Sequence, residues 1–206
     1  MAFVKDIAKV IAEQNPADVD ALMNCKYLNS DLSVSETMPE KVMSIGENLQ
    51  IRRFHRFDKN TSVSYVHAGG KIGVLVNLEV SGGIDATVIG KDIAMQIAAA
   101  NPSYLDRSEV PESELEHEKA VLSEQARNEG KPENIIEKMV IGRINKYYKE
   151  VCLVDQEFIR DGDLTISKLL KSKNAEVVRF ARFQLGEGIE KKQENFAEEI
   201  QKQINQ

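Results

Sequence analysis

The stretch KDIAMQIAAANP at residues 91–102 decides the fold, because the similar stretch KDIAKVIAEQNP stands at residues 5–16. In both copies the apolar residues recur at helical spacing, which in the second begins just upstream with Ile89 and continues with Ile93 and Ile97, and both stop at Asn-Pro. We therefore predict one amphipathic helix in each copy, ending before its proline.

A second pair of similar stretches lies downstream of these helices. RFHRF at residues 53–57 matches RFARF at residues 179–183. Each lies in an alternating stretch that is typical of a strand, from Leu49 to Phe57 and from Val177 to Leu185. A helix followed later by a strand thus occurs twice. The sequence predicts an α+β fold of two related subdomains with small antiparallel sheets.

The second copy is longer than the first because of an insertion. From Lys5 to Arg53 is 48 residues, whereas from Lys91 to Arg179 is 88, a difference of 40. A charged helical segment of this size runs from about residue 112 to 150. Gly-Lys-Pro at residues 130–132 divides it, with glycine ending one helix and proline opening the next. We predict a helical coiled-coil hairpin inserted in the second subdomain.

These features predict three parts: a core subdomain at residues 1–60, a second core subdomain at 61–188 that bears the hairpin, and a C-terminal helical module at 189–206. A pair of strands from Ser64 to Val80 precedes the second helix, and no such pair precedes the first. We therefore expect a strand pair and an upstream segment to be missing from the first subdomain.

Shorter elements complete the prediction. A short helix is expected from Pro39 to Ile45, closed by Gly46. Thr165 is expected to cap a helix that runs to about Lys173.

Composition excludes several classes of function. The chain has 206 residues, 42% of them hydrophobic and 29% charged, with a net charge of −6. This acidic balance argues against a nucleic-acid-binding protein, which needs an excess of Lys and Arg. No apolar run reaches the roughly 20 residues that span a bilayer, and residues 1–6 do not resemble a signal peptide. We expect a cytoplasmic protein in which Cys25 and Cys152 are buried structural thiols.

The sequence contains no recognisable motif of a phosphate-binding loop, a metal site or a catalytic nucleophile. Gly69-Gly70-Lys71 lacks the GxxxxGK[ST] spacing and precedes a strand, so it predicts a hairpin turn and not a phosphate loop. His55, His67 and His117 are scattered, and no set of residues has the spacing of metal ligands. No GxSxG motif is present. We predict no cofactor, no metal site and no catalytic residue, hence a protein that is not an enzyme.

Specific strings add to this pattern. They are IGENLQIRR at residues 45–53, YVHAGGKIGVLV at 65–76, KDIAMQIAAANP at 91–102, GKPENI at 130–135, EKMV with GR at 137–143, and GEGIEK at 186–191. In this order and at these separations, the strings make the chain resemble translation elongation factor Ts along nearly its whole length.

The resemblance implies a guanine nucleotide exchange factor that binds elongation factor Tu and promotes GDP release by distorting its magnesium and phosphate site. It implies that Ile45, Gly46 and His67, beside Gly69 and Gly70, meet the nucleotide domain of that partner. The tail from about Ile189, with Lys191 and Phe196, is expected to lie on a helix of the same domain. Members of the family begin with a three-helix module and carry a Thr-Asp-Phe motif before the first core helix. Neither is found in this sequence, so reduced exchange activity is expected of this chain.

Two other functions compete with exchange. The chain could be a binding or homodimerising module with little exchange activity, which would bind elongation factor Tu without accelerating GDP release. An enzyme would instead require a pocket with converging titratable groups.

Overall fold

The computed structural model describes residues 2–83 and 85–188, so the predicted tail helix lies outside the described residues. The chain forms two compact units, Met1–Lys59 and Asn60–Gln206, and each is described by itself. Among the described residues, the first unit is built of helices, and the second combines helices with two small antiparallel sheets. The predicted α+β class is confirmed.

Three helices make up the first unit: α1 (Ala2–Gln14), α2 (Val19–Asn24) and α3 (Val34–Ile45). Their apolar faces meet in a small core with five buried residues, which are Ile7, Val10, Ile11, Leu22 and Val34. Asp18 caps α2, since its carboxylate accepts a hydrogen bond from the Ala21 amide at 2.7 Å. The predicted helix over the first KDIA repeat is therefore present as α1, and it is held by the short helices that follow.

The helix α3 corrects the prediction that a short helix begins at Pro39. It begins at Val34, because Ser33 and Glu36 form a capping box. The Glu36 amide donates to Ser33 Oγ at 3.2 Å, and the Ser33 amide donates to Glu36 Oε2 at 2.7 Å. Pro39 thus lies inside the helix, where it removes one backbone hydrogen bond. The capping box holds the first turn in spite of this loss.

The strand predicted from Leu49 to Phe57 is wrong, since no strand lies between α3 and residue 61. Instead, Ile51 and Phe54 pack against the core of the helical unit. Strand formation needs a neighbouring strand to accept and donate the ladder of hydrogen bonds. Among the described residues of the first unit, none forms a strand that could serve as that neighbour.

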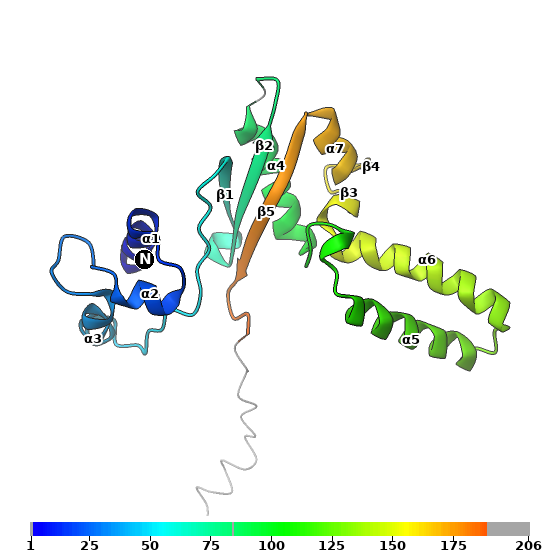
Figure 1. Ribbon diagram of the computed structural model, residues 1–206, viewed down its shortest axis with the longest axis horizontal. Helices are drawn as coiled ribbons and strands as arrows, with labels where there is room; N and C mark the ends of the chain where they lie inside the picture. Colours follow the sequence, from blue (N-terminus) through cyan, green and yellow to red (C-terminus); the bar gives the residue numbers. More distant parts are fainter. Residues whose placement is uncertain (1, 84, 189–206) are drawn as a thin grey trace, which may run out of the picture. The chain divides into compact units, whose positions relative to one another are not determined.

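The second unit is organised by a sheet with the strand order β1-β2-β5, all antiparallel (Figure 1). The strands are β1 (Thr61–His67), β2 (Ile72–Val80) and β5 (Ala175–Gln184). β2 is central: it pairs with β5 from Ile72 to Val80 and with β1 from Ile72 to Leu78. The RFARF stretch, unlike its counterpart at residues 53–57, therefore forms a strand.

One face of this sheet is covered by α4 (Ala86–Ala100), the helix of the second KDIA repeat. Ile93, Ala94 and Ile97 of α4 are buried against strand residues such as Val76 and Leu78. The close approach depends on Gly90. A Cβ atom at this position would lie 2.5 Å from Val63 Cγ2 and 2.7 Å from Leu78 Cδ1.

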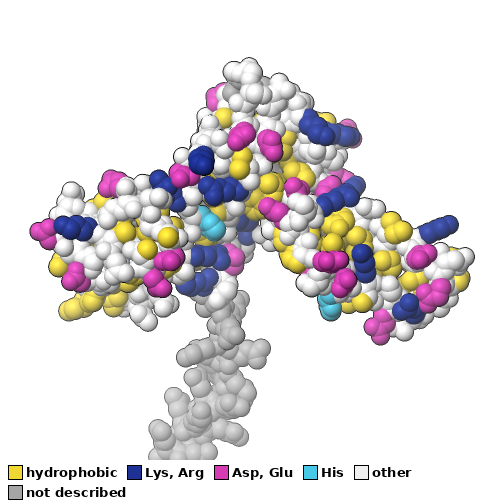
Figure 2. Space-filling view, viewed as in Figure 1, with side chains coloured by type: hydrophobic (Ala, Val, Ile, Leu, Met, Phe, Trp, Pro, Cys, Tyr) yellow, Lys and Arg dark blue, Asp and Glu magenta, His cyan; other side chains and the backbone are white. Residues whose placement is uncertain are grey.

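The two helices predicted on either side of residues 130–132 are present as α5 (Glu112–Asn128) and α6 (Glu133–Val151). They pack along each other through Leu122, Ala126, Ile136 and Ile144, which are buried. Figure 2 shows side chains of both signs of charge interspersed over this hairpin. Short elements precede and follow it: η2 (Arg107–Glu109), η3 (Leu153–Asp155), β3 (Glu157–Phe158), β4 (Asp161–Thr165) and α7 (Ile166–Ser172). Thr165 caps α7, as predicted.

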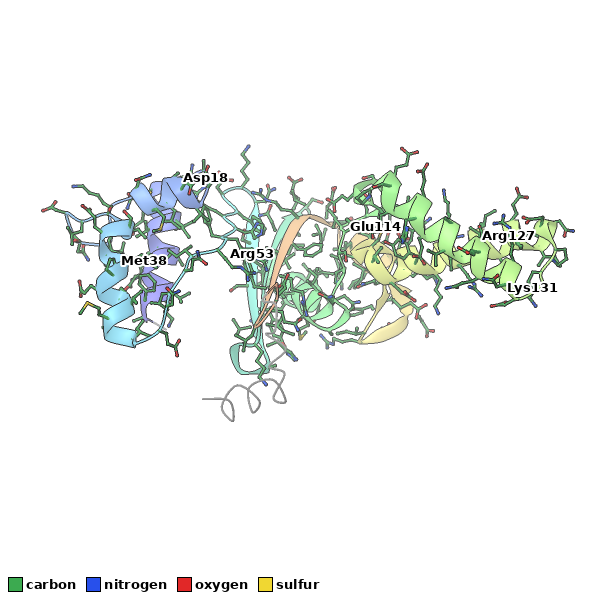
Figure 3. The ribbon with its side chains drawn as sticks, turned by 90° about the horizontal axis from the view of Figure 1, so that it is seen from below. Asp18, Met38, Arg53, Glu114, Arg127 and Lys131 are labelled. Carbon is green, nitrogen blue, oxygen red and sulfur yellow. The ribbon has the colours of Figure 1, made fainter. Side chains whose placement is uncertain are left out.

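Glu114 fixes the base of the hairpin. Figure 3 shows it near the base, while Arg127 and Lys131 lie at the far end. Its carboxylate accepts hydrogen bonds from the hydroxyl of Tyr104, at 2.5 Å, and from the hydroxyl of Tyr147 on α6. These bonds lower the pKa of Glu114, with the Tyr104 bond as the largest cause. The first turn of α5 is thus tied both to α6 and to the segment that leads from α4.

An ion pair also stabilises the base of the hairpin. Arg107 donates to Asp155 at 2.9 and 3.0 Å, and its guanidinium lies 4.7 Å from the centre of the Tyr148 ring. The base of the hairpin is therefore held to the rest of the second unit by both hydrogen bonds and an ion pair.

Two glycine substitutions should have opposite effects on stability. Gly90→Ala should lower the free energy of unfolding by about 1–3 kcal/mol, because the new methyl group overlaps Val63. Gly142→Ala, in the middle of α6, meets nothing within 4 Å and should raise it by about 1 kcal/mol. Urea unfolding followed by circular dichroism measures both. Equal effects of the two substitutions would contradict this account of α4.

Glu114→Gln should destabilise the protein at neutral pH, and the difference from wild type should shrink in acid. A carboxylate with a lowered pKa contributes stability above its ordinary pKa of about 4.3 and loses it as the pH falls through the lowered value. Urea unfolding at a series of pH values between about 3 and 7 tests this. Glu116→Gln, on the exposed side of α5, is the control and should change little.

Candidate partner-binding site

The β1–β2 turn is the best-defined surface feature among the predicted site residues. It follows His67 and contains three consecutive residues with positive φ: Ala68 at 50°, Gly69 at 66° and Gly70 at 96°. The Lys71 amide closes the turn on the Ala68 carbonyl at 3.4 Å. Glycines adopt these angles without steric cost, and a strand follows. The predicted hairpin turn is confirmed.

His67 ends β1 and is exposed. Its Nδ1 atom lies 2.9 Å from the hydroxyl oxygen of Tyr65, a hydrogen-bonding distance, and the two ring centroids are 5.8 Å apart. Tyr65 is half-buried and packs against the core under α4. The imidazole is thus anchored on one side and faces solvent on the other. The Tyr65 contact was not predicted, although alternation along a strand places residues 65 and 67 on one face.

Apolar side chains accompany the turn. Val66 is 67% exposed and Leu185, just after β5, is 76% exposed. The Leu185 amide donates to the Lys71 carbonyl at 2.8 Å, which places the end of β5 beside the turn. Sequence reasoning did not single out either residue, since isolated apolar residues are common on protein surfaces.

The other predicted surface lies in the first unit, at the end of α3. Gly46 ends this helix with φ of 77° and donates its amide to the Val42 carbonyl at 2.9 Å. Beside it Ile45 is 49% exposed and Met43 is 85% exposed. The structure thus presents an apolar edge at the place where the sequence predicted a contact, and adds Met43 to it.

The predicted site residues therefore fall into three groups. Ile45 and Gly46 are neighbours in the first unit, and His67, Gly69 and Gly70 are neighbours in the second. Ile189, Lys191 and Phe196 lie outside the described residues.

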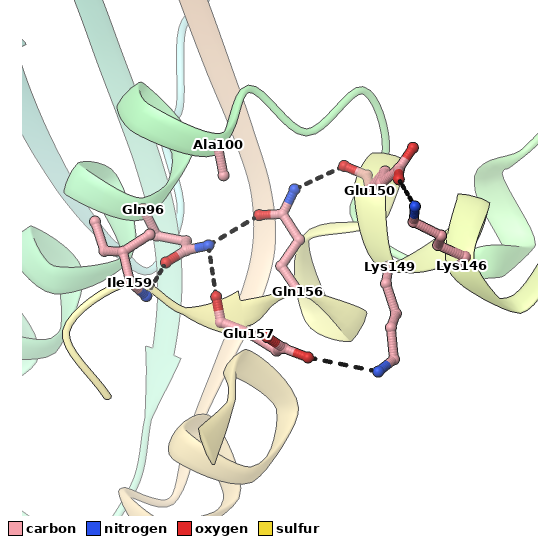
Figure 4. Close-up of a pocket in the computed structure, with 8 residues that line it drawn as sticks. All are labelled: Gln96, Ala100, Lys146, Lys149, Glu150, Gln156, Glu157 and Ile159. Atoms are coloured by element: carbon pink, nitrogen blue, oxygen red, sulfur yellow. Dashed lines mark hydrogen bonds and ion pairs between the residues drawn. The ribbon is translucent and has the colours of Figure 1, made fainter. Parts of the chain in front are cut away.

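A hollow of about 570 Å³ lies between α4 and the base of α6 (Figure 4). Its floor holds the buried side chains of Gln96 and Gln156. Gln96 Nε2 donates to Gln156 Oε1 and to the Glu157 carbonyl, both at 3.1 Å. Gln96 Oε1 accepts from the Ile159 amide at 2.9 Å, and Gln156 Nε2 donates to the Glu150 carbonyl at 2.9 Å. The two side-chain amides form hydrogen bonds with each other and with backbone groups, and in this way they connect α4 with the end of α6.

The lysines at the rim of this hollow are paired as well. Lys146 lies 3.8 Å from Glu150 and Lys149 lies 3.6 Å from Glu157. The hollow therefore shows no converging set of free charges that would bind a substrate.

Within residues 2–83 and 85–188, no group of three or more His, Cys, Asp or Glu side chains is arranged to hold a metal ion. No helix in the same residues is long and apolar enough to cross a membrane.

The two thiols differ in burial. Cys152 is buried, and this burial raises its pKa to about 11, which keeps the thiol neutral. Cys25, expected to be buried, is only half-buried and donates weakly to the Ala21 carbonyl at 3.4 Å.

Comparison with known proteins gives a consistent result. The family described as Elongation factor TS matches residues 1–187. Elongation factor Ts of Clostridium acetobutylicum is 47% identical over the whole of this chain, and that of Clostridium novyi is 48% identical over 99% of it. The protein of the same name from Limosilactobacillus fermentum is 44% identical over 99% of the chain. The chain spans about 70% of the length of the two Clostridium relatives.

The structure is thus that of a mixed α+β protein, and the predicted contact residues that it describes lie at an exposed turn and at a helix end. The comparisons show that the chain is a translation elongation factor. The chain belongs to the elongation factor Ts family.

The turn itself can be tested by two glycine substitutions three residues apart. Gly70→Ala should lower the free energy of unfolding by about 1–2 kcal/mol, because φ of 96° is strained for an L-residue with a Cβ atom. Gly73→Ala is the matched control, since its Cβ meets nothing within 4 Å and its φ is not positive. Thermal unfolding of both variants measures the difference. A stable Gly70→Ala variant would show that this turn conformation is not needed.

Proposed function

We propose that the chain is a guanine nucleotide exchange factor that acts in the cytoplasm, binds elongation factor Tu and promotes release of GDP. It makes no covalent bond and carries out no chemical step of its own. Membership of the elongation factor Ts family carries this proposal. It is supported by His67, an exposed histidine held by a hydrogen bond on a well-defined turn.

The proposed contact surface has two parts. In the second unit, His67 and the turn at Gly69 and Gly70 meet the partner near its magnesium and phosphate site. In the first unit, Ile45 and Gly46 contribute an apolar edge, with Met43 beside them as an addition from the structure. Ile189, Lys191 and Phe196 are proposed to anchor the tail on a helix of the nucleotide domain.

The mechanism follows from linkage. A factor that binds the GTPase best in a shape that holds GDP and magnesium poorly weakens nucleotide binding, and GDP weakens binding of the factor by the same ratio. Each 1.4 kcal/mol of coupling changes affinity about tenfold. A large effect therefore needs several cooperating contacts, which favours a spread surface over a compact pocket.

His67→Ala should slow the release of fluorescent GDP from elongation factor Tu by about fivefold to tenfold at a subsaturating concentration of the chain. The substitution removes a contact worth about 1 kcal/mol and leaves the sheet intact. Stopped-flow fluorescence measures the rate. His117→Ala is the matched control, because His117 is exposed on α5, far along the chain from the turn.

The outcomes separate the two candidate functions. Unchanged release and binding in His67→Ala would remove this residue from the site. Wild-type chain that binds elongation factor Tu without accelerating release would select the alternative, a binding or homodimerising module. Light scattering of the chain alone measures whether it pairs with itself.

A further inference from the structure

The hydrogen bond between Tyr65 and His67 has a role that the sequence motifs do not indicate. We propose that Tyr65 is a positioning residue, whose hydroxyl holds the His67 imidazole in one orientation and one tautomer at the exposed turn. The proposal rests on the proposed function, in which His67 contacts the partner. It adds the chemistry of that contact.

The geometry of β1 brings the two side chains together. Residues 65 and 67 lie on the same face of β1, because side chains alternate along a strand. The Tyr65 hydroxyl oxygen lies 2.9 Å from His67 Nδ1, and the two rings are inclined by 34°. His67 therefore has one ring nitrogen occupied inside the chain, and its Nε2 atom is the one left for a partner.

The two side chains differ in burial. Tyr65 packs against the core under α4 and pairs in register with Val74, which is 4% exposed. His67, by contrast, is exposed at the end of the strand, opposite Ile72. An anchored phenol ring thus limits the rotation of an exposed imidazole. A side chain ordered before binding loses less conformational entropy when the complex forms.

Acid–base chemistry then fixes the tautomer. A tyrosine hydroxyl can donate a hydrogen bond, and the unprotonated nitrogen of a neutral imidazole is a stronger acceptor than a phenol oxygen. The hydroxyl therefore donates to Nδ1, which places the proton of the neutral ring on Nε2. The outward nitrogen is consequently a donor, and His67 selects a hydrogen-bond acceptor on the partner, such as a carbonyl or carboxylate oxygen.

Tyr65→Phe removes the hydroxyl and keeps the ring that packs against the core. In the free chain, long-range ¹H–¹⁵N NMR of the neutral imidazole reports the tautomer. In wild type His67 should be more completely in the Nε2–H form than His117, whose imidazole makes no hydrogen bond with the described residues. In Tyr65→Phe this excess should disappear. A wild-type His67 that carries its proton mainly on Nδ1 would overturn the proposal without any variant.

A double-mutant cycle tests the functional part. Tyr65→Phe should slow GDP release from elongation factor Tu by about twofold to tenfold, the effect of one hydrogen bond. In the His67→Ala background it should have no further effect, because the two residues act through one contact. Tyr27→Phe is the matched control: Tyr27 donates to Asp6 at the same distance of 2.9 Å in the first unit, and its loss should leave release unchanged.

The cycle distinguishes failure of this inference from failure of the proposed function. Equal slowing by Tyr65→Phe with and without His67 would show that Tyr65 acts independently of the histidine and would overturn the inference alone. Wild-type release in His67→Ala would remove His67 from the proposed contact. The tautomer measurement in the free chain would then still decide whether Tyr65 holds the ring.

Discussion

The two-sided pairing of β2 is the constraint on which the second unit depends. On one side β2 pairs with β1, to which a short turn connects it. On the other side it pairs with β5, whose residues lie about a hundred positions later in the chain. Everything between β2 and β5, including the helical hairpin, is thereby enclosed in one unit. Gly90 lets α4 approach this strand closely enough to bury Val76 and Leu78. The sheet then supports the turn that carries His67.

The two RF repeats show that tertiary context decides between strand and loop. Residues 179–183 form part of β5 because β2 offers a complementary edge. Residues 53–57 have the same alternation but form no strand, and Phe54 packs on a helical core instead. Strand propensity records how well side chains fit a pleated, half-buried surface, so it cannot create that surface. The repeat was therefore a better guide to helices than to sheets.

Local signals in the sequence predicted what local interactions determine. The Gly-Lys-Pro division of the hairpin, the Thr165 cap and the glycines of the β1–β2 turn all act within a few residues, and each is present. The early start of α3 also has a local signal, the Ser33–Glu36 capping box, which lies upstream of the predicted start at Pro39. The bonds that join Gln96 to Gln156 and Glu114 to Tyr147 link residues 33 to 60 positions apart, and no local pattern indicates them.

Rigidity of the turn matters for any protein that works by deforming its partner. When two proteins bind, the more flexible surface changes shape. A flexible turn would therefore be distorted itself and would leave the nucleotide site of the partner unchanged. The two strands that flank the β1–β2 turn pair with each other, and β2 also pairs with β5. The hydrogen bond from the Leu185 amide to the Lys71 carbonyl and the contact of Tyr65 with His67 hold the turn further. Its positive φ angles fall mainly on glycines, for which they carry little strain. In the proposed function, a braced turn of this kind transfers binding energy into distortion of the GTPase, whereas a loop without these anchors would itself be distorted.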